Sequence, residues 1–209
     1  MINQQILRFR LNPNGQNLYD FCMHIGVVGI GWPKTGDVSG LNKNELISKL
    51  REAYPEENFN NRQIGLIAGY FTRLINMKVG DYVLISAPNN NVTIAQVTKP
   101  YKFNEKYIYK DIAHQVSIKQ IKTVPMATFD IKLKKSIDAA NTIIMIHDTK
   151  MIEDIRKIAE NPEQIPLVIS DISFRKFKIQ KSEKKIIELS ITSNITKKDL
   201  YSMIDAIEF

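Results

Sequence analysis

The sequence predicts an α+β protein built on a curled antiparallel sheet. Three observations lead to this prediction: short apolar segments bounded by turn residues occur along the chain, two amphipathic helices stand together near its middle, and strands and helices do not alternate regularly. Regular alternation would instead favour a doubly wound parallel sheet. A chain of 209 residues is long enough to bury a core of its own.

The first part of the chain predicts two strands and a short helix. Residues 5–11 read as a strand, and the Pro and Gly within residues 12–17 mark a turn. Residues 19–24 predict a short helix. Residues 27–32 predict a glycine-rich strand that lets another backbone come close and that ends before Pro33.

Two longer helices follow. Asn42 and Glu45 form a capping pair at the start of the first helix, which Pro55 stops. The second helix has one apolar face, made by steps of three and four residues. The apolar positions are Leu46, Ile47, Leu50 and Tyr54 in the first helix, and Ile64, Ile67, Ala68, Phe71 and Ile75 in the second.

A β-hairpin comes next. Residues 78–81, Lys-Val-Gly-Asp, form a turn into a strand over residues 82–87, and Pro-Asn-Asn-Asn separates that strand from another over residues 92–98. Residues 112–121 predict one more strand. The apolar run 142–147 fits either a strand or a buried segment.

The character of the sequence changes near Thr149, so we expect a main domain over residues 1–148 and a small C-terminal appendage or linker region over residues 149–209. A helical stripe runs from Met151 to Ile158. Strands are predicted over 174–179 and 186–191, and a last helix, capped by Thr196 and Asp199, ends at Ile207. These segments give the appendage a β-β-α order.

Several protein classes are excluded by composition. The single cysteine, Cys22, cannot form an internal disulfide, and the three histidines show no metal-ligand spacing. Phosphate-binding, dinucleotide-binding, serine-hydrolase and zinc-protease motifs are absent from the sequence. No run of apolar residues matches a membrane helix or a signal peptide. We therefore expect a cytoplasmic protein with no cofactor, no metal and no catalytic activity of its own.

The positive charge is concentrated in two segments. Residues 99–135 hold nine lysines against three acids, and residues 175–185 hold six basic residues against one acid, while the whole chain has a net charge of +7. These segments, together with Phe174 directly before the second, carry the aromatics Tyr101, Phe103, Tyr107, Tyr109, Phe174 and Phe177. This mixture suits a phosphate backbone and stacked bases. The alternative is that the lysines cover the solvated face of strands whose aromatics face the core.

Two motifs occur together in this order. Gly29-Ile30-Gly31-Trp32 is followed by Gly36-Asp37, and residues 77–85 (MKVGDYVLI) are followed by residues 94–101 (IAQVTKPY). Over residues 5–147 this pattern resembles the PUA-like, EVE/YTH-type domain that precedes the nuclease or motor part of Mrr-type and McrB-like restriction proteins. The resemblance implies a PUA-like curled antiparallel β-barrel flanked by helices.

The resemblance also implies site residues. PUA-like readers of modified bases stack an extruded base on aromatic faces and read its edge with polar groups. Trp32 and Tyr70 are the candidate aromatic walls, although a lone Trp also suits a core, and Asp37 either accepts from a base or closes the turn with Gly36. The remaining candidates are Ser86, Ala87 and Pro88 for the base pocket and Lys99, Tyr101 and Lys102 for phosphate contacts.

We therefore expect a DNA-binding specificity module of a restriction or anti-phage defence system that recognises a modified or flipped base, with a nuclease or motor as its partner. An RNA-binding module and an unflipped, site-specific DNA reader are alternatives. A hydrolase or transferase with a site at Trp32, Asp37 and His114 is a third interpretation, and a protein-interaction scaffold a fourth.

Overall fold

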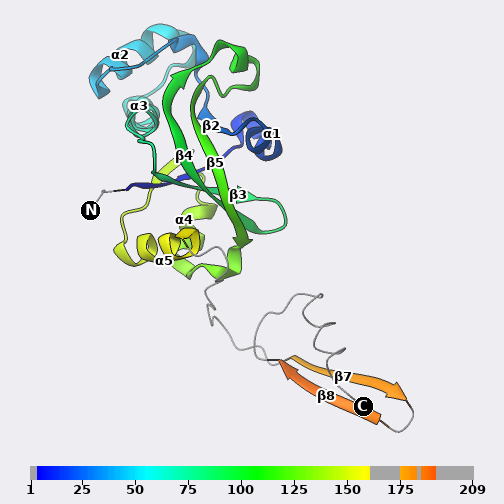
Figure 1. Ribbon diagram of the computed structural model, residues 1–209. Helices are drawn as coiled ribbons and strands as arrows, with labels where there is room; N and C mark the ends of the chain where they lie inside the picture. The colour runs from blue at the N-terminus through cyan, green and yellow to red at the C-terminus, as the bar shows by residue number, and fades with distance from the viewer. Residues whose placement is uncertain (1–3, 161–174, 183–184, 192–209) are drawn as a thin grey trace. The chain divides into compact units, whose positions relative to one another are not determined.

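The computed structural model describes residues 4–160 and the backbone of two further strands, β7 (Arg175–Ser182) and β8 (Lys185–Ile191). The chain divides into two compact units, Met1–Pro166 and Leu167–Phe209 (Figure 1). No helix in the described part of the chain is long and apolar enough to span a membrane.

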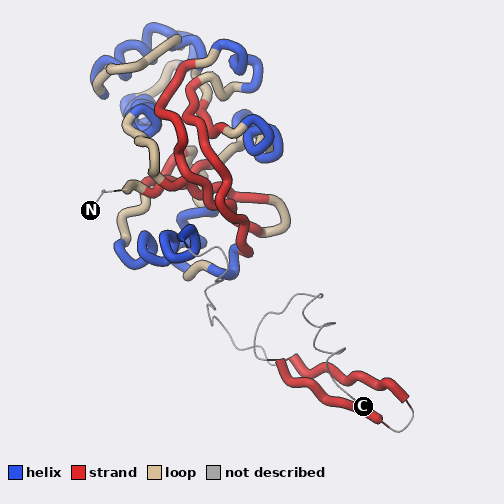
Figure 2. The backbone as a smooth tube through the Cα atoms, in the orientation of Figure 1, coloured by secondary structure: helices blue, strands red, loops and turns tan. Residues whose placement is uncertain are grey.

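The first unit is built on a six-stranded sheet with the strand order β2-β5-β4-β3-β1-β6. Figure 2 draws the strands in red and the helices beside them in blue. The strands are β1 (Ile6–Phe9), β2 (Val27–Ile30), β3 (Tyr82–Ala87), β4 (Asn91–Phe103), β5 (His114–Pro125) and β6 (Ile143–Met145). This curled half-barrel confirms the predicted fold class. One feature differs from the expected antiparallel sheet, because β1 pairs parallel with β3.

Five α-helices accompany this sheet: α1 (Tyr19–Ile25), α2 (Lys43–Ala53), α3 (Asn61–Ile75), α4 (Ile131–Asp138) and α5 (Thr149–Glu160). The capping box of Asn42 and Glu45 is present at the start of α2 as predicted. Sequence patterning did not indicate α4, whose first turn is capped by Asp130 accepting from the Leu133 N–H.

Helices cover both faces of the sheet. Successive residues of a strand point to opposite faces, so Leu7 and Phe9 of β1 join one buried cluster with α1, α2 and α3, whereas Ile6 joins a second cluster with α4 and α5. In Figure 1 the helices α2 and α3 lie towards one end of the long β4–β5 pair, and α4 and α5 lie towards the other. The strands are thus apolar on both faces at their centre.

The long β4–β5 pair supplies the curl. The register between β4 and β5 shifts after Ile94, after Val97 and after Lys99, and such bulges bend a strand pair and increase its twist. Because of these shifts, β4 continues through Pro100 to Phe103, beyond the end predicted at residue 98. This extension carries the basic and aromatic segment to the end of the sheet where β5 begins.

The Lys-Val-Gly-Asp turn has a structural role. Gly80 adopts a φ of 98°, a region open to glycine at little cost. The buried Asp81 carboxylate accepts from the backbone N–H of Lys78 at 2.8 Å and of Gln5 at 2.9 Å. This motif therefore ties the start of β1 to the start of β3, which explains its value as a marker of the fold.

The domain boundary differs from the one predicted after residue 148. Helix α5 belongs to the first unit because Met151, Ile155 and Ile158 are buried in its second cluster. In the second unit, β7 and β8 pair antiparallel, in agreement with two of the predicted appendage elements. The last predicted helix, residues 196–207, lies outside the described residues.

Arg8 is a fully buried cation in the sheet. Its guanidinium donates to the backbone carbonyls of Ser136, Ala139 and Asn141 at 3.0, 3.0 and 2.6 Å. Burial, with a smaller contribution from the positive charge of Arg10, lowers the pKa of Arg8 to about 10. Three carbonyls thus replace a counter-ion, and they join β1 to the turn between α4 and β6.

We predict that Arg8→Ala lowers the free energy of unfolding by about 2–4 kcal/mol, because it leaves three carbonyls without their donor and opens a cavity. Arg10→Ala, at an exposed residue just after the end of β1, should change it by less than about 0.5 kcal/mol. Urea denaturation followed by circular dichroism measures both. Equal, small effects would show that the Arg8 contacts contribute little.

Candidate nucleic-acid interface

A pocket of about 590 Å³ lies at the end of the sheet where β2 finishes. Five parts of the chain enclose it: the loop after β1, the β2 end with its short helix η2 (Pro33–Thr35), the α2–α3 connection, the residue Asp111 before β5, and the turn before β6. Side chains from distant positions line it, namely Arg10, Asn12, Trp32, Lys34, Tyr54, Glu57, Phe59, Asp111 and Thr142.

Trp32 adopts a left-handed backbone conformation, with φ 62° and ψ 49°. For a bulky residue this costs about 1–2 kcal/mol, so it persists only where neighbouring groups determine it. Its N–H donates to the Asp111 carboxylate. Its carbonyl accepts from the Thr35 hydroxyl at 2.8 Å and from His114 at 3.2 Å. The ring is half-buried, and Trp32 is one of the residues that line the pocket.

His114 is fully buried and connects the Trp32 loop to β4. Its Nε2 lies 3.2 Å from the Trp32 carbonyl, which can only accept, so Nε2 carries the proton and Nδ1 accepts from the Tyr101 hydroxyl at 2.8 Å. Burial lowers the pKa of His114 to about 4. The ring is therefore neutral at pH 7. It is a structural support rather than an acid or base available to a ligand.

Asp111 brings a half-buried carboxylate into the pocket. Burial raises the pKa of this carboxyl, while the hydrogen bond from the Trp32 N–H lowers it. A Cβ at Gly31 would lie 2.4 Å from Asp111 Oδ2, so glycine at position 31 is what allows the carboxylate to approach the backbone. Asn14 Nδ2 donates to the same oxygen at 3.4 Å.

A second acceptor in the pocket has no partner. Asn12 Oδ1 is buried and makes no hydrogen bond within the described residues. A buried carbonyl without a donor costs free energy unless a ligand or water supplies one. The Asp111 carboxylate therefore gives the pocket an acceptor suited to a group that donates hydrogen bonds, whereas the Asn12 oxygen lies within the pocket wall, closed to solvent.

Two more aromatic residues line the pocket. Tyr54 and Phe59 come from the connection between α2 and α3, and both are half-buried. The Tyr54 hydroxyl accepts from the Lys34 N–H at 2.9 Å, and Lys34 Nζ lies 5.2 Å from the Tyr54 ring centroid while pairing with Glu56. The pocket thus combines aromatic faces with polar acceptors, as sites for planar ligands do.

Two predicted pocket residues have other roles. Tyr70 is 5% exposed and packs behind Trp32, with ring centroids 6.3 Å apart, so it supports Trp32 and does not line the pocket. The Asp37 carboxylate is exposed and accepts from the Ser39 N–H and hydroxyl at 2.9 and 2.7 Å, which lower its pKa. Asp37 therefore closes a turn, which is the second of the two roles that the sequence allowed for it.

Ser86, Ala87 and Pro88 lie at the opposite end of the sheet. Ser86 and Ala87 pair with Val92 and Asn91, and the same part of β4 pairs with the end of β5 at Pro125. Trp32 lies beside His114, the first residue of β5. Because β5 has 12 residues, its two ends lie on the order of 30 Å apart. The structure therefore does not bring these three residues to the pocket.

The predicted phosphate contacts lie at the pocket end of the sheet. Lys99 and Lys102 are exposed and pair in register with Ser117 and Gln115, near the start of β5. Tyr101, between them, is half-buried and its hydroxyl supports His114. Tyr101 is therefore part of the scaffold, whereas the two lysines remain candidates for phosphate.

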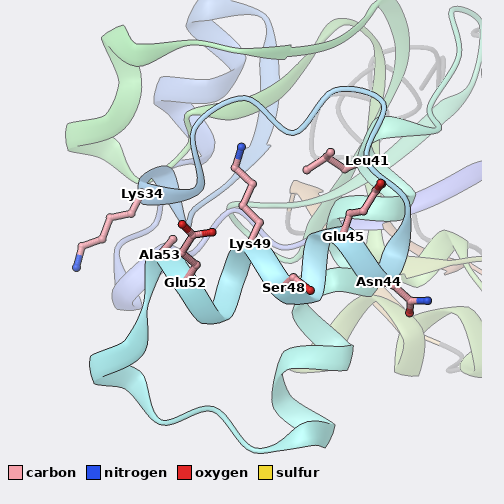
Figure 3. Close-up of a pocket in the computed structure, with 8 residues that line it drawn as sticks. All are labelled: Lys34, Leu41, Asn44, Glu45, Ser48, Lys49, Glu52 and Ala53. Atoms are coloured by element: carbon pink, nitrogen blue, oxygen red, sulfur yellow. The ribbon is translucent and has the colours of Figure 1, made fainter.

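A larger hollow of about 780 Å³ runs along α2 (Figure 3). It is an open groove lined by side chains of both charges and by no aromatic ring. Figure 3 shows Lys49 reaching from α2 towards the preceding loop, where its Nζ donates to the Asp37 carbonyl at 3.1 Å. Among the described residues, no three His, Cys, Asp or Glu side chains gather to hold a metal ion. The Trp32 pocket is thus the better candidate site.

Of the side chains that line the pocket, sequence reasoning identified only Trp32, and among those it missed are Asn12, Tyr54, Phe59 and Asp111. Tyr54 has helical spacing and was interpreted as an apolar position, and Asn12 lies in a segment that reads as a turn. Only the Gly31 preceding Trp32 hinted that something approaches the backbone there. No local signal identified that group as Asp111.

A family model described as "Domain of unknown function (DUF8426)" matches residues 9–147. Among solved structures, the YTH domain of the Zygosaccharomyces rouxii MRB1 protein, in complex with N6-methyladenosine RNA, is similar over 76% of this chain and 88% of that chain, at 12% identity and a TM-score of 0.40. Protein Atu2648 from Agrobacterium tumefaciens is similar over 73% of this chain and 91% of that chain, at 14% identity and a TM-score of 0.36. No curated protein matches the chain.

The buried neutral His114 predicts a pH dependence of stability. Its pKa is near 6.5 in the unfolded chain and about 4 in the folded one. Between these values the unfolded chain binds the extra proton, so stability is fully present above about pH 6.5 and falls by up to about 3 kcal/mol as the pH drops to about 4.

Urea denaturation between pH 4 and pH 7 measures this slope. His114→Gln should lack the His114 contribution, whereas His147→Gln, a change at an exposed histidine, should keep it. The same slope in the wild type and in His114→Gln would contradict the assignment.

Proposed function

The chain belongs to the family described as a domain of unknown function (DUF8426), which covers residues 9–147 and hence the whole Trp32 pocket, and we propose that it binds nucleic acid and holds one unstacked base there. The observation that carries this proposal is the combination of three aromatic residues with the half-buried Asp111 carboxylate in one pocket. The aromatics are Trp32, Tyr54 and Phe59. Aromatic faces stack on any base, and acceptors read the amino groups on its edge.

The size of the site agrees with a single base. At about 590 Å³ the pocket lies within the range of small-ligand sites, from about 300 to about 1,000 Å³. A base also fits the rigidity of the wall, because Trp32 is held through both its N–H and its carbonyl and rests on Phe71, with ring centroids 6.0 Å apart. A wall that does not need to be ordered on binding loses less entropy.

The charge distribution supports a polyanion as the partner. The exposed Lys99 and Lys102 lie on the strand whose Tyr101 supports His114 and, through it, Trp32. Contacts from such lysines to phosphates are independent of base identity and weaken with salt. In this proposal, the lysines supply general affinity and the pocket supplies selectivity.

We propose DNA as the nucleic acid, and a restriction or anti-phage defence system as the setting, because of the resemblance of the Gly29–Trp32 and Met77–Ile85 motifs to restriction proteins. Recognition is the role proposed for this chain, and cleavage or translocation is assigned to a partner nuclease or motor. The alternative of a hydrolase needs His114 and Asp37 to act on a substrate. It is disfavoured because His114 is fully buried and the Asp37 carboxylate accepts hydrogen bonds from Ser39.

The first test is binding of the chain to matched DNA duplexes, unmodified and with methylated cytosine or methylated adenine, and to RNA of the same sequence, at low and moderate salt. Trp32→Ala should weaken binding of the preferred ligand by about 5- to 100-fold, because it removes the stacking face. Trp32→Phe keeps a ring and should lose less. Fluorescence anisotropy measures the affinities, and thermal unfolding confirms that each variant is folded.

The ligands that bind decide among the alternatives. Preference for one modified duplex, lost in Trp32→Ala, supports a reader of a modified DNA base, and tighter binding to RNA supports an RNA reader. Equal affinity for every ligand, unaffected at Trp32, would contradict the base pocket.

Asp111→Asn tests separately whether the Asp111 carboxylate recognises an amino group on the edge of the base. The amide replaces one acceptor by a donor, so affinity for a base with an amino group should fall about 10-fold or more. In the wild type, affinity should also fall as the pH drops through the raised pKa of Asp111, since the protonated carboxyl accepts less well. Glu57→Gln, at an exposed carboxyl on the same pocket, is the matched control. Equal affinities of the Asn variant and the wild type would show that Asp111 does not recognise the base.

A further inference from the structure

The short helix η4 (Glu105–Lys110) presents two large apolar side chains to solvent. Tyr109 is 71% exposed and Ile108 is 43% exposed. Single exposed apolar residues are common and need no explanation. Here they are consecutive, and Asp111, the carboxylate of the Trp32 pocket, follows Tyr109 by two residues. Two residues span at most about 7 Å, so Tyr109 stands beside the pocket.

The exposed tyrosine is carried by an anchored segment. Tyr107 packs edge-to-face on Phe21 of α1, with ring centroids 5.8 Å apart. The Asn104 side chain caps the start of η4, and Asp111, in a left-handed conformation, closes its end through an N–H bond to the Ile108 carbonyl at 2.9 Å. Because both ends of η4 are held, the position of Tyr109 relative to the pocket is set by the fold.

Two lysines lie beside the aromatic rings of this segment. Lys110 Nζ lies 5.6 Å from the centroid of the Tyr109 ring and 5.5 Å from that of Phe21. Lys106 is exposed, and its Nζ lies 5.7 Å from the Tyr107 ring centroid. An aromatic face next to ammonium groups suits a base and its phosphate at once, because the ring stacks and the lysines neutralise charge.

We propose that Tyr109 stacks on the base next to the one held in the Trp32 pocket, with Lys106 and Lys110 facing the phosphates between them. This inference rests on the proposed function and adds a second contact to it. The chain then recognises a short stretch of strand with at least two unstacked bases. Affinity for an isolated nucleotide is correspondingly lower than for a strand.

Two single-stranded DNA pentanucleotides serve as probes, one centred on N6-methyladenine and one on 5-methylcytosine, each compared with the corresponding nucleoside monophosphate. Tyr109→Ala should weaken pentanucleotide binding by about 5- to 100-fold and leave binding of the monophosphate unchanged. Tyr109→Phe keeps the stacking ring and should remain near the wild type. Ile131→Ala, at another exposed apolar residue, is the control for a general loss of apolar surface.

A second set of pentanucleotides lacks the bases on both sides of the central base. With abasic sites on both sides, wild type and Tyr109→Ala should bind equally, because the stacking partner is gone. Trp32→Ala should weaken binding of every probe, including the monophosphate.

The outcomes separate the two proposals. Binding that depends on Trp32 but not on Tyr109 overturns the stacking role alone. Binding that depends on Tyr109 but not on Trp32 keeps the aromatic contact and overturns the pocket. Failure of the wild-type chain to bind either pentanucleotide overturns the stacking role and, with it, the proposal that the pocket holds an unstacked base of DNA.

Discussion

The candidate site depends on the strained backbone of Trp32. A tryptophan in the left-handed region is stable only when its peptide groups are held on both sides, and here the Asp111 carboxylate takes its N–H while His114 and Thr35 engage its carbonyl. Thr35 belongs to the same loop as Trp32, whereas Asp111 and His114 lie together at the start of β5, far along the chain. The conformation that presents the ring is therefore a property of the assembled sheet end, and loss of any one partner affects the pocket.

His114 links this strain to the rest of the fold. The residue begins β5, pairs opposite Ile30 of β2, and receives a hydrogen bond from Tyr101 of β4. Three strands thus converge on one neutral ring, which Phe71 of α3 contacts edge-on at a centroid distance of 4.7 Å. A buried network with every member satisfied is rigid, and rigidity suits a stacking wall that holds a ligand without rearrangement. On the other side of the pocket, Arg8 fixes the turn that contributes Thr142.

Much of the architecture could be predicted because it follows from local patterns. The capping box of α2, the apolar face of α3 and the β3–β4 hairpin each lie within a short stretch of sequence, and their boundaries agree with the structure to within a few residues. Long-range pairing was harder. The parallel β1–β3 pair joins residues some 76 positions apart, and helix α4 is short enough for its apolar pattern to escape notice.

The sequence by itself determined the α+β class, most of the elements, the clustering of lysines and aromatics, and the prominence of Trp32, because each of these is written in residue type and spacing. Only the tertiary structure decided which residues face a ligand. In the tertiary structure Asp111, Asn12, Tyr54 and Phe59 lie around Trp32. Tyr70 packs behind Trp32, and Asp37 lies in a surface turn. Ser86, Ala87 and Pro88 lie at the far end of β5. The physical reason is that a pocket is formed by loops brought together by sheet register, and a register between distant strands leaves no local pattern in the chain.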